Sequence, residues 1–117
     1  MSRSPDWIRL RHMLDASLKA QSIVGSRDAI ELAEDETALL ALERLIAILG
    51  EAAGRLSRST TDRMPGIPWP QVVGMRNILV HAYFEVEVPR LLATVNGDLP
   101  PLIVELERIL REDGHLD

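Results

Sequence analysis

The chain has 117 residues, a formal net charge of −5 and no cysteine. A chain of this length forms one domain, here residues 1–117, and can bury about two thirds of the surface that it exposes when unfolded. Its 46% hydrophobic and 26% charged residues exclude it from the disordered class. The missing cysteines exclude disulfides and thiolate metal sites, and they fit a cytoplasmic protein.

Neither a secretion signal nor a membrane span is expected. Residues 1–6 lead into a charged segment, and no run approaches the ~18 apolar residues of a transmembrane helix. The negative net charge argues against sequence-blind binding of nucleic acid through a broad electropositive surface. It still allows an enzyme that engages RNA at a small local cluster of arginine and histidine.

The first predicted element is a helix with Ser4 as its N-cap and Pro5 at its first helical position, ending at residues 25–26. Ser26 is then placed to cap a short helix over residues 27–33. Both predictions rest on the preference of helix N-termini for side chains that accept hydrogen bonds from free backbone N–H groups.

A long helix is predicted over residues 35–56. Apolar residues cover well over half of its circumference, so it must be buried on two sides. One side faces the bundle core. The other faces either a partner subunit or a second neighbour in the same compact bundle, and the segment favours neither alternative. Gly50, inside this helix, costs about 1 kcal/mol relative to alanine, which indicates a close approach by another helix.

The second half of the chain begins with a loop over residues 57–70, which holds three prolines. A helix over residues 69–86 follows, and Pro89 is predicted to break the helical run. A short helix then ends at residues 96–97, and Asp98 caps the last helix. No strand pattern competes, so the predicted fold class is all-α.

Four chemically versatile side chains lie within eight residues of the predicted helix over 69–86: Arg76, Asn77, His81 and Tyr83. At about 100° per residue, Tyr83 falls about 20° to one side of Arg76. Asn77 and His81 fall about 100° and about 140° to the other side. The opposite arc is apolar and suited to a core. An ordinary exposed face carries Glu and Lys, so this set indicates a chemical site.

These residue types suit RNA cleavage. Histidine gives or takes a proton near neutral pH, and such acid–base catalysis contributes about 10²- to 10⁴-fold. Arginine stays charged and offers a planar fork that fits phosphate oxygens, while asparagine orients the imidazole or donates to a phosphoryl oxygen. RNA supplies its own nucleophile, the 2′-hydroxyl. A site with only Arg, Asn and His could therefore cleave RNA without a metal, a cofactor or a covalent intermediate. Consistent with this prediction, no carboxylate lies on this arc to hold Mg²⁺.

Spacing alone is a weak argument for this site. A helical histidine beside an arginine is most often a hydrogen-bonded surface pair, and Tyr83 and Phe84, taken singly, more often pack than react. The complete pattern R-N-x-x-x-H-x-Y-F over residues 76–84 is what favours function. His12 and His115 have no spaced partner, so both are predicted to be incidental.

At these residues the chain resembles the HEPN superfamily, and specifically its HepT-like toxins. The matching segments span nearly the whole chain in order and spacing: residues 9–16, 48–57, 67–69, 74–84 and 98–102. Arginine followed four residues later by histidine is weak by itself, whereas the added tyrosine and the flanking segments make the resemblance specific. Ala82 departs from the pattern, because the family commonly has glycine there.

The resemblance implies a four- to five-helix up-and-down bundle, which dimerises through the helices that line the active-site cleft. Toxins of this type are metal-independent endoribonucleases, each silenced when a minimal, MntA-like nucleotidyltransferase antitoxin transfers AMP to the motif tyrosine. On this chain, Arg76 would bind the scissile phosphate, His81 would act as acid or base, and Asn77 would orient. Tyr83 would accept AMP. The implied partners are RNA, the antitoxin and a second copy of the chain, with no membrane.

The sequence also allows a different class of function. The chain could be a non-catalytic helical HEPN module that docks a nucleotidyltransferase and helps to bind its nucleotide or substrate. The set of Arg76, Asn77 and His81 favours the ribonuclease, because an adaptor has no need of an imidazole.

Overall fold

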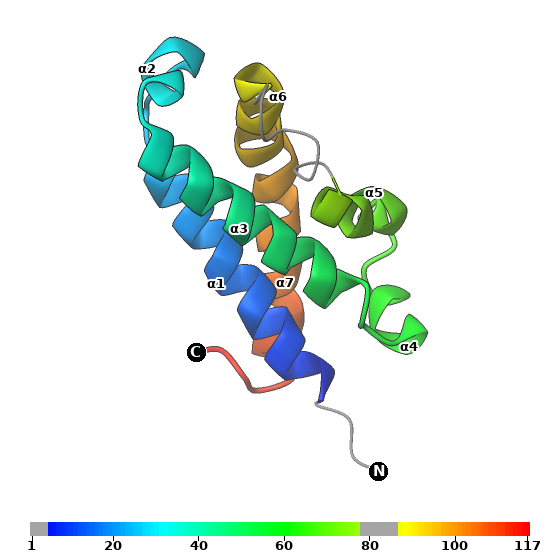
Figure 1. Cartoon of the computed structure of the whole chain (residues 1–117). Coiled ribbons are helices and arrows are strands. Elements are labelled where there is room, and N and C mark those ends of the chain that lie inside the picture. The colour runs from blue at the N-terminus through cyan, green and yellow to red at the C-terminus, as the bar shows by residue number, and fades with distance from the viewer. Residues whose placement is uncertain (1–4, 78–86) are drawn as a thin grey trace.

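The computed structural model describes residues 5–77 and 87–117, and every regular element in these ranges is helical (Figure 1). The elements are α1 (Asp6–Val24), α2 (Ala29–Ala33), α3 (Glu36–Ala53), α4 (Arg58–Thr61), α5 (Trp69–Gly74), the 3₁₀ turn η1 (Met75–Asn77), α6 (Val88–Ala93), the π-helical segment η2 (Thr94–Asp98) and α7 (Leu99–Glu112). Because these ranges contain no strand, the structure confirms the predicted all-α class.

Helix α1 lies at the centre of a helical bundle. It packs along α3, which runs antiparallel to it, and along α7, while α5 and η1 lie against α3 (Figure 1). The side chains between these helices are fully buried and apolar: Leu10, Met13, Leu42, Ile46, Leu49, Leu102, Leu106 and Ile109. This arrangement confirms the predicted helical bundle.

The second side of α3 is covered within the chain. One flank of this helix packs on α1, and another packs on α5 and η1. Neighbours within the chain therefore cover part of its apolar circumference on both flanks, whereas a contact with a partner subunit stays a prediction. Leu40, at 55% exposure, is the large apolar side chain of α3 that this packing leaves in solvent.

Helix starts and stops follow local chemistry, with two corrections. Helix α1 starts at Asp6, so Pro5, predicted at its first helical position, is instead the residue before the helix. Gly25 ends α1 with a positive φ of 54°, as expected. The cap of α2 is Asp28 rather than Ser26. The Asp28 carboxylate accepts from the backbone N–H of Glu31 at 2.8 Å, and the Glu31 carboxylate accepts from the backbone N–H of Asp28 at 3.2 Å. This reciprocal pair satisfies two free donors at once, where a serine cap satisfies one. Ser4 lies outside the described residues.

The predictions for the second half of the chain are only partly correct. The predicted loop contains α4, capped by the Ser57 side chain. The break predicted near Pro89 agrees with the structure, because Glu87 is not helical and a new helix, α6, starts at Val88 with Pro89 in its first turn. Residues 96–97 do not end a helix, because α6 continues through η2 into α7, and the Asp98 side chain makes no cap hydrogen bond.

The C-terminal end of the chain is held against the start of α1. The His115 ring stacks on Trp7 with ring centroids 4.3 Å apart and planes 7° from parallel. The Arg11 guanidinium donates to the backbone oxygen of His115 at 3.2 Å. His115, predicted to be incidental, thus holds the C-terminal segment against α1.

The start of α1 is also bonded to α4 through Asp6. One carboxylate oxygen accepts from the Ser57 backbone N–H at 2.9 Å and from the Ser57 and Thr60 hydroxyls, each at 2.6 Å. Partial burial acts to raise the pKa of Asp6, but these hydrogen bonds outweigh it and lower the pKa below its ordinary value. A carboxylate with a lowered pKa stabilises the fold above the pKa of the unfolded chain, about 3.9, and loses that effect as the pH falls through the folded pKa.

We therefore expect Asp6→Asn to lower the free energy of unfolding at pH 7 by about 1–2 kcal/mol, since a charged acceptor of three hydrogen bonds becomes neutral. The difference from the wild type should shrink below about pH 4. Urea titrations from pH 3 to pH 7 measure it. Asp15→Asn, at an exposed position of the same helix, is the matched control. An equal loss for both variants, or a pH-independent loss, would contradict the role given to Asp6.

Candidate functional site

The candidate site begins where η1 packs against α3. A Cβ atom built on Gly50 would lie 2.5 Å from the backbone nitrogen of Arg76 and 3.1 Å from its Cα. The two backbones therefore touch at a distance that no side chain allows, which explains a glycine inside α3. The close approach predicted from Gly50 is confirmed, and its partner is the arginine of the motif.

Gly54, one turn further along, extends the same contact. A Cβ atom there would lie 3.5 Å from a Val73 methyl group and 3.6 Å from Nη1 of Arg76, both ordinary van der Waals distances. The Arg76 side chain thus runs over the glycine face of α3 toward its C-terminal end. The backbone of this arginine is fixed, while its guanidinium remains exposed.

The local sequence accounts for this placement. Helix α5 starts at Trp69, whose indole N–H donates to the backbone oxygen of Met64 at 3.1 Å. Met75, only 2% exposed, anchors η1 in the core directly before Arg76. A buried residue followed by two exposed polar ones, on a turn attached to a rigid helix, presents Arg76 and Asn77 to solvent in a defined position.

The structure places only part of the predicted site. Arg76 and Asn77 are both exposed and consecutive on η1. Within the described part of the predicted helix over 69–86, residues 69–74 are α-helical and residues 75–77 form a 3₁₀ turn. In such a turn adjacent side chains are separated by about 120° rather than about 100°. His81 and Tyr83 lie outside the described residues, so their meeting with Arg76 stays a prediction.

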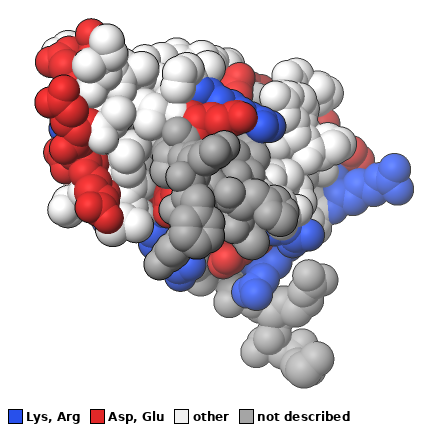
Figure 2. Space-filling view, turned by 45° about the horizontal axis from the view of Figure 1, so that its top comes forward, with Lys and Arg blue, Asp and Glu red and all other residues white. Residues whose placement is uncertain are grey.

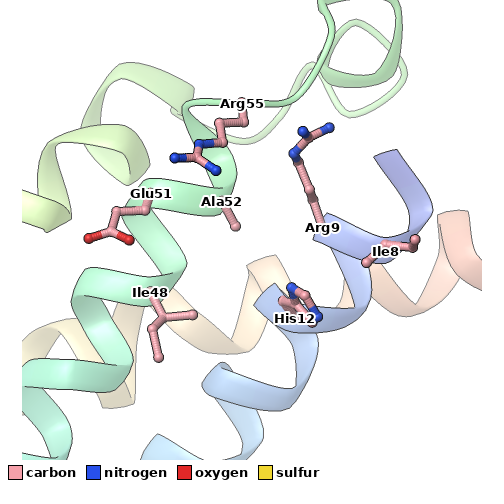
Figure 3. Close-up of a pocket in the computed structure, with 7 residues that line it drawn as sticks. All are labelled: Ile8, Arg9, His12, Ile48, Glu51, Ala52 and Arg55. Atoms are coloured by element: carbon pink, nitrogen blue, oxygen red, sulfur yellow. The ribbon is translucent and has the colours of Figure 1, made fainter. Parts of the chain in front are cut away.

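A second group of polar side chains, missed in the sequence, lies near the same end of α3. Arg9 and His12 of α1, with Glu51 and Arg55 from the end of α3, line a groove of about 210 Å³ (Figure 3). The remaining lining is apolar: Ile8, Ile48 and Ala52. The sequence held a signal for this groove, since residues three and four apart share a helix face. His12, predicted to be incidental, lines this groove with residues of another helix.

Charge is distributed unevenly over the surface. Figure 2 shows a column of acidic side chains along one edge, while protruding basic side chains lie at the opposite edge. A net charge of −5 is therefore compatible with local basic regions such as the one at the end of α3. Among the described residues, no helix is both long and apolar enough to cross a bilayer.

Fold and site together define an all-α bundle that presents Arg76 and Asn77 on a 3₁₀ turn packed against α3. The family model described as "Ribonuclease HepT-like" matches residues 13–109. The chain belongs to the HepT-like ribonuclease family. This membership confirms the resemblance found in the sequence and places the chain among ribonucleases.

Individual relatives agree with this assignment. A protein of Thermococcus cleftensis named probable ribonuclease HepT is 36% identical over 75 residues, which are 64% of this chain and 68% of the relative. A Methanocaldococcus jannaschii protein provisionally named an RNase is 36% identical over 67 residues, 57% of this chain and 62% of that relative. The alignment therefore spans about three fifths of the length of the second relative. No solved structure gives a significant match.

Proposed function

We propose that this chain is a metal-independent endoribonuclease toxin of a toxin–antitoxin pair. The observation that carries the proposal is the placement of Arg76, whose backbone is fixed against Gly50 while its guanidinium is exposed. A rigidly held arginine fork is the group best suited to bind a phosphodiester as charge develops on it. Family membership supports the same conclusion.

In the proposed reaction, Arg76 binds the scissile phosphate and Asn77 orients the reacting groups. His81 takes the proton from the ribose 2′-hydroxyl, and the 2′-oxygen attacks phosphorus. The bond to the 5′-oxygen breaks, and this leaving oxygen takes up a proton. The products are a 2′,3′-cyclic phosphate and a 5′-hydroxyl. Because RNA supplies the nucleophile and the protein supplies charge and a proton carrier, the reaction requires no metal ion.

Two partners belong to this proposal. A second copy of the chain would bring its own motif to a shared cleft, and exposed Leu40 on α3 is available to such a contact. A minimal, MntA-like nucleotidyltransferase would be the antitoxin. A cytoplasmic location, where both RNA and the antitoxin are found, remains part of the proposal.

Incubation of the purified chain with single-stranded RNA in excess EDTA tests the function. We expect cleavage fragments that end in a cyclic phosphate, detected by mass spectrometry. RNA left intact, both with EDTA and with added Mg²⁺, would overturn the ribonuclease proposal and favour a non-catalytic module that docks a nucleotidyltransferase.

Control by the antitoxin gives a separate prediction at Tyr83. The Tyr83 oxygen would attack the α-phosphorus of ATP and release pyrophosphate, so that each AMP brings a phosphate that competes with RNA for the Arg76 fork. We expect co-expression with the cognate nucleotidyltransferase to add one or more AMP groups, visible by intact mass, with a proportional loss of cleavage. Tyr83→Phe should keep most cleavage and escape silencing. An unmodified Tyr83 in a fully inhibited complex would show that the antitoxin acts by occlusion instead.

A further inference from the structure

We propose that the groove between α1 and α3 is a second RNA subsite, which binds the ribose-phosphate unit next to the scissile phosphate. This inference rests on the proposed ribonuclease function and extends it to residues outside the R-N-x-x-x-H-x-Y-F motif. Arg55 would bind the phosphate and Glu51 the ribose.

Arg55 is the cation best placed for this role. It is exposed at the end of α3, and its guanidinium makes no hydrogen bond or ion pair with any part of the chain that the structure describes. Arg9, across the groove, is anchored by Asp6 at 3.4 Å and adds positive charge from a fixed position. His12 adds a ring N–H donor from the next turn of α1 (Figure 3).

The groove and the motif arginine converge on the same stretch of α3. Nη1 of Arg76 lies 3.6 Å from the position of a Cβ on Gly54, and Gly54 is bonded directly to Arg55. Consecutive Cα atoms are about 3.8 Å apart. Arg76 and Arg55 therefore both lie at the C-terminal end of α3, and the proposal places neighbouring phosphates of one strand on them.

The size and lining of the groove favour a nucleotide unit over a free small ligand. Its volume, about 210 Å³, is below the roughly 300–1,000 Å³ of pockets that enclose a drug-sized molecule. Three of its lining residues, His12, Glu51 and Arg55, are exposed, so the groove is open to solvent, as a bound polymer needs. Ile8, Ile48 and Ala52 supply an apolar wall for a sugar face.

Glu51 gives the groove a reason to prefer RNA. A carboxylate repels phosphate, so its presence beside Arg55 is unfavourable for a simple anion site. It is, however, a strong acceptor for a hydroxyl group, and the 2′-hydroxyl is the group that distinguishes RNA from DNA. Glu51 and Arg55, four residues apart, form no ion pair in the described structure, and both are therefore available to a ligand.

The test measures binding of a fluorescein-labelled single-stranded RNA of mixed sequence, and of the DNA of the same sequence, by fluorescence anisotropy. The full-length chain carries His81→Ala so that the RNA is not cut. We expect Arg55→Ala to weaken RNA binding roughly tenfold and to reduce the slope of log K against log salt by about 0.7, the effect of one phosphate contact on a single strand. Arg55→Lys should retain much of the affinity.

Two further variants make the test specific. Glu51→Ala should reduce the preference for RNA over DNA by roughly fivefold while leaving DNA binding equal or stronger, because an acceptor and a negative charge are both lost. Arg111→Ala, with the same change in charge on α7 and outside the groove, should leave binding within twofold.

The outcomes separate this inference from the proposed function. If Arg55→Ala binds RNA within twofold of the His81→Ala parent while the wild type cuts RNA, the subsite is overturned and the ribonuclease proposal stands. A wild type that does not cut RNA, with Arg55→Ala still weakening RNA binding, would overturn the ribonuclease and retain the subsite. A change of oligomeric state in Arg55→Ala, seen by light scattering, would show that the groove joins two copies of the chain and would also overturn the subsite.

Discussion

Arg76→Ala is expected to abolish RNA cleavage, with a loss of at least about 10²-fold in rate, while the melting temperature stays nearly unchanged. The loss follows because the fork that would hold the scissile phosphate contributes most when charge develops in the transition state. The fold should survive because the guanidinium is exposed and the anchoring contacts of η1 come from Met75 and the Arg76 backbone. Cleavage of labelled RNA in EDTA and thermal melting by circular dichroism measure both quantities.

Two further variants separate the contributions of charge, donor geometry and proton transfer to cleavage. Arg76→Lys keeps the charge but loses the two-pronged donor geometry, so an intermediate rate is expected. His81→Ala should also be inactive, through loss of the proton carrier. An Arg76→Ala or His81→Ala variant that cuts RNA at the wild-type rate would show that the assigned role is wrong. A variant that is inactive because it is unfolded would favour a purely structural role for that residue.

Gly50→Ala is expected to damage both stability and activity, although alanine is the better helix former by about 1 kcal/mol. The new methyl group would lie 2.5 Å from the Arg76 backbone nitrogen, so α3 and η1 must move apart. Overpacking of this kind costs about 1–3 kcal/mol. Because η1 carries Arg76, the proposed phosphate-binding residue, we also expect at least about a tenfold loss of cleavage from its displacement.

Gly54→Ala is the matched control for this prediction. It lies one turn further on the same helix face, where a Cβ would meet its neighbours at 3.5–3.6 Å, so it should keep stability and activity close to wild type. Urea denaturation and the cleavage assay on both variants decide the matter. Equal behaviour of the two variants would mean that the contact between Gly50 and Arg76 does not set the position of the site.

The sequence predicted helix ends correctly where they depend on interactions between neighbouring residues. The stop at Gly25 needs only a left-handed backbone conformation, which glycine adopts without strain. The prediction of Ser26 as the cap of α2 was wrong. Asp28 caps this helix, supported by the hydrogen bond that its backbone N–H donates to the Glu31 carboxylate. The continuous run of α6, η2 and α7 was also missed. Buried Thr94 and Val95 hold η2 against α1, and this tertiary packing overrides the local tendency of Gly97 to end a helix.

In the candidate site, too, the sequence predicted the residues, whereas their contacts depend on tertiary packing. The resemblance and the residue types in the sequence identified Arg76 and Asn77 as a pair, and Gly50 as a point of close approach. Neither could show that Gly50 approaches Arg76 itself, because the two residues are 26 positions apart and meet only when η1 folds onto α3. The groove of Arg9, His12, Glu51 and Arg55 was missed for a similar reason, because the spacing within each helix shows a shared face but not that the two faces meet.

The sequence by itself determined the all-α class, the HepT-like family and the residue types of the proposed chemistry, because periodicity, caps and motif spacing are written in neighbouring residues. Only the tertiary structure decided which helix faces meet, since contacts between distant segments depend on how all the helices pack. It fixed the Arg76 backbone against α3 and opened the groove beside Arg55. The first feature arises because Gly50 lets two backbones touch at a distance that side chains otherwise prevent, and the second because side chains of α1 and α3 line one groove.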